Sequence, residues 1–133
     1  MATIPSRLER LNYGAPDGCI ATGRHCQVID GVGATRTLAP EESGALCLFD
    51  RAAGVVYTLP APQVGMTFDF TVSVAVTSNA YKVITNSASV FLLGSVMSGN
   101  LTVAASGDVF QANGTTHVAI SMNGTDTGGL IGG

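Results

Sequence analysis

Residues 66–77 read MTFDFTVSVAVT, and each of the six even-numbered positions from 66 to 76 is apolar. The odd-numbered positions carry mostly Thr, Ser and Asp. Successive side chains of a β-strand point to opposite faces, so this alternation predicts a long strand with one buried face and one solvent-facing face. Burying six such side chains would contribute on the order of 10 kcal/mol, so we expect the fold to form around this strand.

Further apolar runs follow at intervals of roughly ten residues, the spacing of an all-β domain. We expect strands at residues 45–49, 54–59, 80–85, 90–97, 101–105, 108–112 and 117–122. The segment 90–97, VFLLGSVM, is continuously apolar, which predicts a strand buried on both faces. Residues 50–53, Asn113-Gly114 and Asn123-Gly124 are typical of hairpin turns. The sequence therefore predicts an all-β domain that is a sandwich, a jelly roll or a barrel.

The first 40 residues differ from the rest because they show no sustained period of two or of 3.6 residues. Prolines and glycines interrupt them throughout. We therefore predict an extended N-terminal arm over residues 1–40 and a β-sandwich body over residues 41–133. The arm is either a disordered tail or a segment that orders by lying over a neighbouring subunit.

Charged residues make up only 11% of the chain, and the net charge is −3 with a mean hydropathy of +0.37. With Lys82 as its single lysine, the chain lacks the clustered cations that bind nucleic acid. No apolar run reaches the roughly 20 residues of a membrane span, and the N-terminus does not resemble a signal peptide. Either the protein is a neutral soluble domain, or partners cover much of its weakly charged surface.

Cysteine and histidine are the first candidates for chemistry, and Cys19, His25, Cys26 and Cys47 could in principle bind zinc. Their spacing lacks the paired C-x2-4-C of structural zinc sites. A cupin-like metalloenzyme would need clustered histidines, and the chain contains only two. We therefore predict free thiols, no disulfide framework, and neither metal nor cofactor.

Other catalytic arrangements are also weak. His117 is expected on the solvent face of its strand, where it would not pair with a nucleophilic cysteine. Glu41 and Glu42 are adjacent and diverge in an extended chain, and Asp69 stands alone on its face. The glycine-rich residues 30–35 lack the GK[ST] of a phosphate loop and are interpreted as a turn. We therefore predict a protein that is not an enzyme and has no catalytic residue.

Three N-x-[ST] motifs occur, at Asn100, Asn113 and Asn123. Such motifs accept glycans only in secreted proteins. Since no secretory signal is expected, we interpret these asparagines as turn residues.

Three segments resemble a family of tailed-phage structural proteins: FDRAAGVVYTLPAP (49–62), TFDFTV followed by TSNAYKV (67–83), and NGTDTGGL (123–130). The family is that of capsid decoration, or cement, proteins. The resemblance implies a small jelly-roll-like fold that binds the major capsid protein and itself, as a homodimer or homotrimer. It implies a location on the capsid exterior of the virion, after synthesis in the host bacterial cytoplasm, and no catalytic residue.

A carbohydrate-binding module of a tail fibre or baseplate is the alternative, because similar folds serve both uses. Such a site needs an exposed aromatic platform, and the chain has no Trp. Tyr57 and Tyr81 are the candidate platforms.

Overall fold

The computed structural model describes residues 27–99 and 107–125, which form an all-β structure in three sheets. The all-β class is therefore confirmed. Its strands are β1 (Val28–Ile29), β2 (Thr35–Thr37), β3 (Leu46–Phe49), β4 (Val56–Thr58), β5 (Asp69–Val72), β6 (Tyr81–Ile84), β7 (Leu93–Gly99), β8 (Gly107–Asn113) and β9 (Ala119–Met122). A single 3-10 turn, η1 (Pro40–Glu42), is the helical element of the described residues.

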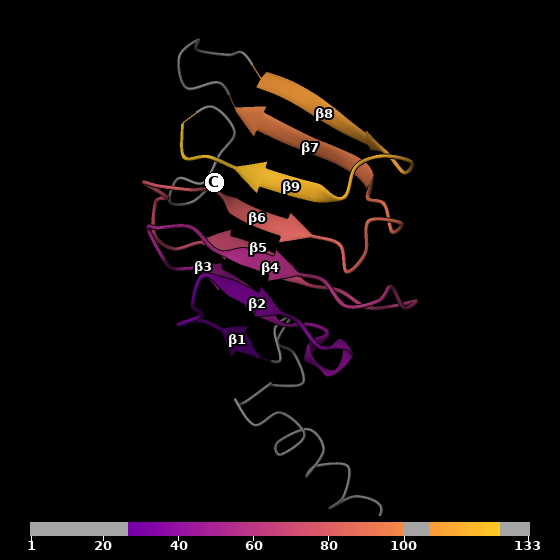
Figure 1. Cartoon of the computed structure of the whole chain (residues 1–133), viewed down its shortest axis with the longest axis horizontal. Helices are drawn as coiled ribbons and strands as arrows, with labels where there is room; N and C mark the ends of the chain where they lie inside the picture. Colours follow the sequence, from indigo (N-terminus) through magenta and orange to yellow (C-terminus); the bar gives the residue numbers. More distant parts are fainter. Residues whose placement is uncertain (1–26, 100–106, 126–133) are drawn as a thin grey trace, which may run out of the picture.

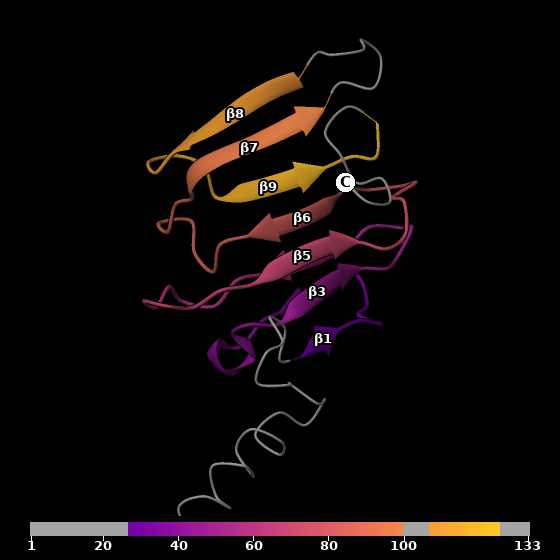
Figure 2. The same cartoon turned by 180° about the vertical axis from the view of Figure 1, so that it is seen from behind.

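The chain winds between two sheets that lie face to face (Figures 1 and 2). The first sheet has the order β1-β3-β5 and the second has the order β2-β4-β6-β9. Each strand from β1 to β4 pairs in parallel with the strand two further along the chain, whereas β9 joins β6 antiparallel. This winding is the arrangement of a short parallel β-helix.

The expected jelly-roll topology is not confirmed, because neighbouring strands of a jelly roll run antiparallel. Residues 50–53 connect β3 to β4, which lie in different sheets, so the hairpin predicted there is wrong. Asn113-Gly114 connects β8 to β9, which are also not neighbours in a described sheet. A turn sequence specifies a local change of direction, but it does not specify whether the chain reverses within one sheet or crosses to another.

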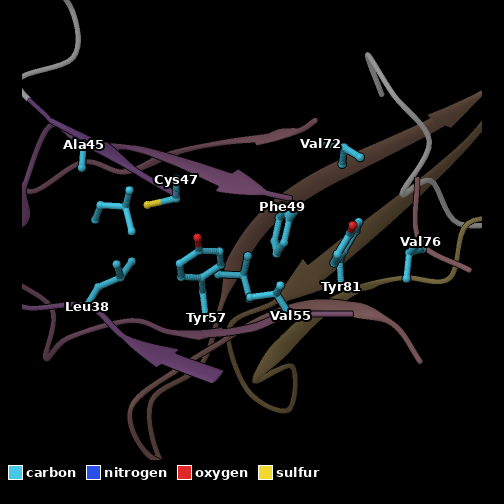
Figure 3. Close-up of a cluster of buried hydrophobic side chains, with 11 residues drawn as sticks. Leu38, Ala45, Cys47, Phe49, Val55, Tyr57, Val72, Val76 and Tyr81 are labelled. Atoms are coloured by element: carbon cyan, nitrogen blue, oxygen red, sulfur yellow. The ribbon is translucent and has the colours of Figure 1, made fainter. Parts of the chain in front are cut away.

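Aromatic side chains fill the space between the two sheets (Figure 3). The ring of Phe49, from β3, stacks on the ring of Tyr81, from β6, with centroids 4.6 Å apart. Phe49 also meets Tyr57, from β4, edge-on at 5.3 Å. All three residues are fully buried. Such pairs contribute about 0.5–1.5 kcal/mol each beyond the burial of their area.

The long strand predicted at residues 66–77 is only partly correct, since β5 spans Asp69–Val72. Phe70 and Val72 are more buried than their neighbours, as the alternation predicts, but Val74 is exposed. The N–H groups of Ser73 and Val74 both donate to the carbonyl of Phe49, at 3.1 Å. These two bonds turn the chain out of the strand, and the alternation ends there.

The predicted arm also requires correction. Strands β1 and β2 pair with β3 and β4, so residues 28–37 belong to the two sheets rather than to an extended arm. Ile29 is buried in the core, although its local sequence shows no period. Residues 1–26 lie outside the described part of the chain.

The strand predicted at residues 90–97 is present as β7, but its predicted burial on both faces is wrong. Leu93 and Met97 are 80% and 83% exposed. β7 pairs with β8 in a two-stranded ribbon, and no other described strand belongs to that sheet. A continuous apolar run shows that both faces are apolar, but not that anything in the chain covers them. The strand predicted at residues 101–105 lies outside the described residues.

Replacing Tyr81 by Phe tests how the core holds the chain at the corners between the sheets. The buried Tyr81 hydroxyl lies 2.9 Å from the carbonyl of Arg51 and 2.7 Å from that of Val74. Without this donor both acceptors lose a partner, so Tyr81→Phe should lower the free energy of unfolding by about 1–3 kcal/mol in a urea titration. Tyr57→Phe is the comparison, because among the described residues the Tyr57 hydroxyl has one acceptor fewer and donates to the carbonyl of Leu48. A Tyr81→Phe protein as stable as the wild type would contradict this role.

Candidate functional site

Two of the segments that resemble phage proteins lie in the double-sheet winding. Residues 49–62 include the end of β3, the corner that follows it and all of β4. Residues 67–83 include β5, the next corner and most of β6. These segments therefore supply two successive corners of the winding.

The two corners are hydrogen-bonded to each other. The Thr77 N–H donates to the carbonyl of Ala52 at 2.8 Å, and the Asn79 amide nitrogen donates to the carbonyl of Ala53 at 2.9 Å. Asn79 has a φ of 58°, in the left-handed region that asparagine tolerates better than most residues. Residues 77–79, the T-S-N of the second segment, therefore hydrogen-bond one corner to the corner before it.

Two glycines allow these corners to approach closely. Gly54 has a φ of +89°, and a Cβ placed on it would lie 2.9 Å from the carbonyl oxygen of Ala80. Gly124, in the third segment, has a φ of +78°, and its Cβ would lie 2.5 Å from the carbonyl oxygen of Val76. The glycines of these segments are thus explained by packing.

Glu42 is engaged in an ion pair rather than in an acid–base pair. Its carboxylate accepts from the Arg36 guanidinium, and also from the Ala39 N–H at 2.7 Å. Arg36 occupies the inward register position beside Tyr57, at the β2 edge of the second sheet. The ion pair therefore neutralises two charges next to the end of the core.

Cys47 is a free, fully buried thiol between the sheets, as predicted (Figure 3). Burial, with a smaller contribution from the nearby Glu42 carboxylate, raises the pKa of this thiol to about 11. A thiol with this pKa stays protonated at neutral pH and is a poor nucleophile and metal ligand. In the described ranges, no three His, Cys, Asp or Glu side chains form a metal-binding group. Cys19, His25 and Cys26 lie outside these ranges.

His117 is exposed, as expected, in the connection between β8 and β9. Its Nδ1 lies 3.2 Å from the Asn113 side-chain oxygen and 3.4 Å from the Thr116 hydroxyl. Both neighbours are neutral side chains of the same turn. The structure thus places His117 in the connection between β8 and β9, hydrogen-bonded to residues of that connection.

Two asparagines of the N-x-[ST] motifs form turns, which confirms the prediction for them. The Asn113 side-chain oxygen accepts from the Thr115 N–H at 3.0 Å. The Asn123 oxygen accepts from the Thr125 N–H at 2.9 Å. Both are the bonds of an Asx-turn. Asn100 lies outside the described residues.

The glycine-rich residues 30–35 form the connection between β1 and β2, as the turn interpretation expects. The N–H of Gly31 donates to the carboxylate of Asp50. A phosphate loop directs its free N–H groups at an anion, whereas here a carboxylate of the protein already binds one of them.

The prediction that Tyr57 and Tyr81 are platforms for a sugar is wrong, because both side chains are fully buried. Both residues lie at the inward positions of strands in which buried and exposed side chains alternate. An aromatic residue at such a position is more often part of the core than a platform. Among the described residues, the exposed aromatic side chains are instead Phe91, 39% exposed, and Phe110, 54% exposed.

The apolar surface of the β7–β8 ribbon is the feature that the sequence did not predict. Leu93, Met97 and Val109 lie on one face of the ribbon, and Val96 and Phe110 lie on the other. All five are exposed. We call these five side chains the ribbon surface. Exposed apolar patches of this kind mark sites of association.

Comparison of the chain with protein-family models, curated proteins and solved structures finds no match. In residues 27–99 and 107–125, no helix is long and apolar enough to cross a bilayer. The chain's own residues therefore carry the functional inference.

Substituting Gly54 tests whether the segment 49–62 is constrained by packing. Gly54→Ala should lower the free energy of unfolding by about 1–3 kcal/mol, because alanine disfavours the positive φ and its Cβ would meet the Ala80 carbonyl. Gly33→Ala is the matched control, since a Cβ there meets nothing within 4 Å. Equal stability of the two variants in a urea titration would contradict the close approach of the corners.

Alkaline unfolding tests the environment of Cys47. Its pKa is raised from 9.0 to about 11 in the folded protein, so folding holds a proton that the unfolded chain releases above pH 9. Stability should therefore be constant below pH 9 and fall by on the order of 2 kcal/mol as the pH rises to 11. Burial also raises the pKa of Tyr57, which extends the loss to higher pH.

The control for this titration is Cys47→Ala, which has no proton to lose at this position. Its free energy of unfolding, measured with urea from pH 8 to 11, should decline less steeply than that of the wild type between pH 9 and 10. Parallel profiles for the two proteins would show that Cys47 ionises equally in the folded and unfolded chains.

Proposed function

We propose that this chain is a non-enzymatic capsid decoration protein of a tailed phage. It binds the outer surface of the head and stabilises contacts between subunits of the major capsid protein. The observation that carries the proposal is the exposed ribbon surface, which five apolar side chains form on a chain with few charges. The order of the three phage-like segments supports it.

The physical argument rests on the area that such a surface offers. Covering one Leu, Met or Phe side chain contributes about 1.5–3 kcal/mol when the burial is complete. A contact of several such side chains is modest for one copy, but a capsid repeats it over a lattice, and each copy can also contact its neighbours. Low charge suits this role, since it limits the cost of removing charged groups from water.

The proposal includes two partners, the major capsid protein and copies of the chain itself, as a homodimer or homotrimer. It places the protein on the capsid exterior of the virion, after synthesis in the bacterial cytoplasm. The jelly-roll-like sandwich implied by the resemblance is not required for it, because a parallel winding presents flat faces and edges equally well.

The carbohydrate-binding alternative keeps less support than before. Tyr57 and Tyr81 are core residues, so neither can stack on a sugar without unfolding the winding. Phe110 is exposed, and its partner across the ribbon is the exposed, apolar Val96; Gly94 and Ala112 occupy the same face on one side of this pair, and the positions of Ser98 and Asp108 follow on the other. The ribbon therefore suits a protein surface better than a glycan.

Capsid binding by a truncated chain tests the proposal and the arm together. A chain lacking residues 2–26 retains β1 and β2, so the two sheets should stay intact. We expect the full chain to co-sediment with expanded phage heads, and the truncated chain to bind at least about tenfold more weakly with unchanged thermal stability. Binding is measured by sedimentation and by electron microscopy of the heads.

Two results would count against these expectations in different ways. Failure of the full chain to bind heads would contradict capsid decoration. Equal affinity of the full and truncated chains would contradict the role of the arm alone. Glycan-array binding that is lost in Phe110→Ala would favour the alternative.

A further inference from the structure

Among the described residues, no strand pairs with the outer edge of β8. β8 spans seven residues, Gly107–Asn113, and its only strand neighbour among the described residues is β7 (Figures 1 and 2). A free edge presents unpaired N–H and C=O groups that can pair with another chain. Proteins usually protect such edges with Lys, Pro, bulges or very short strands. The β8 sequence GDVFQAN contains neither Lys nor Pro, and its register with β7 is unbroken.

The backbone groups at this edge can be assigned from the ladder. The Gly114 N–H donates to the Leu92 carbonyl at 3.0 Å. In an antiparallel pair, hydrogen-bonded and non-hydrogen-bonded positions alternate, so the hydrogen-bonded partner of Val96 is Phe110. Val109 and Gln111 then direct their N–H and C=O groups away from β7, toward solvent.

We propose that β8 pairs antiparallel with β8 of a second copy across a two-fold axis, which joins the two ribbons into a four-stranded sheet. A second copy of the chain is the expected partner for this edge, because antiparallel pairing of a strand with an identical strand is self-complementary. With the axis beside Phe110, the outward groups of Val109 on one copy meet those of Gln111 on the other. The two Phe110 side chains then face each other in a non-hydrogen-bonded pair, where aromatic pairs stabilise a sheet.

The small size of the ribbon favours its extension by further strands, because β7 and β8 are the two strands of their sheet among the described residues. An isolated two-stranded ribbon is only marginally stable in water, whereas four strands with an apolar face hold together. With the axis beside Phe110, edge-on pairing places Phe110 next to Phe110 on one face and Val109 next to Gln111 on the other.

This inference deepens the proposed function. The role of the dimer on a capsid rests on that function, but the dimer itself forms without a capsid. The two ideas can therefore fail separately. A dimer that does not bind heads would overturn capsid decoration and leave the β8 pairing in place. Binding of heads by a strictly monomeric chain would overturn the pairing and support the decoration.

The experiment is sedimentation velocity on the full chain over a range of concentrations. We expect a monomer–dimer equilibrium that shifts toward the dimer as concentration rises. Val109→Pro should raise the dimer dissociation constant at least about tenfold, because proline removes an edge donor that β7 does not use. Ser95→Pro is its matched control, since Ser95 directs its N–H toward the opposite edge of the ribbon, and this variant should dimerise normally.

A second pair of variants guards against misfolding. Phe110→Lys brings two like charges together across the axis and should abolish the dimer, whereas Met97→Lys adds the same charge to an exposed β7 position and should retain it. In a Cys19→Ser, Cys26→Ser background, Phe110→Cys should form a disulfide-linked dimer on oxidation. A monomer at every soluble concentration, a trimer, or a dimer insensitive to both Val109→Pro and Phe110→Lys would overturn the proposal.

Discussion

The contact of Phe49 with Tyr57 and Tyr81 is the interaction on which the two-sheet winding depends. The rings join the sheets, and the tyrosine hydroxyls reach carbonyls of Leu48, Arg51 and Val74 at the places where the chain turns. Apolar packing and corner geometry are therefore coupled. A ring that shifted would release the corner bonds as well as the core, so the centre of the fold should respond to mutation as one cooperative unit.

Much of the local structure could be predicted from the sequence, whereas the pairing could not. The alternation through Phe70 and Val72 predicts a half-buried strand, and the Asn-Gly pairs predict turns. The strand ends at Val72 because the next two N–H groups bind the carbonyl of Phe49, more than 20 residues earlier in the chain. Parallel pairing depends on such distant contacts, and a single sequence contains no local signal of them.

The candidate sites divide in the same way. Cys47 and Asn113 behave as their residue types predict, because a free thiol and a turn asparagine are decided locally. From the sequence alone, Tyr57 could have been either a core residue or an exposed platform for a sugar. It is a core residue because the facing sheet, β1-β3-β5, helps to cover its ring. The ribbon surface was missed because a continuous apolar run looks the same whether or not another layer covers it.

Strand β9 has a consequence for how copies of this molecule can stack. A parallel winding that ended in a parallel edge strand could template the next molecule end to end and grow into a fibre, as terminal repeats without caps do. β9 enters the second sheet antiparallel to β6, which reverses the polarity of that edge. Because this edge no longer matches the parallel register of β2 and β4, β9 caps this end of the second sheet and does not template a further parallel turn of the winding.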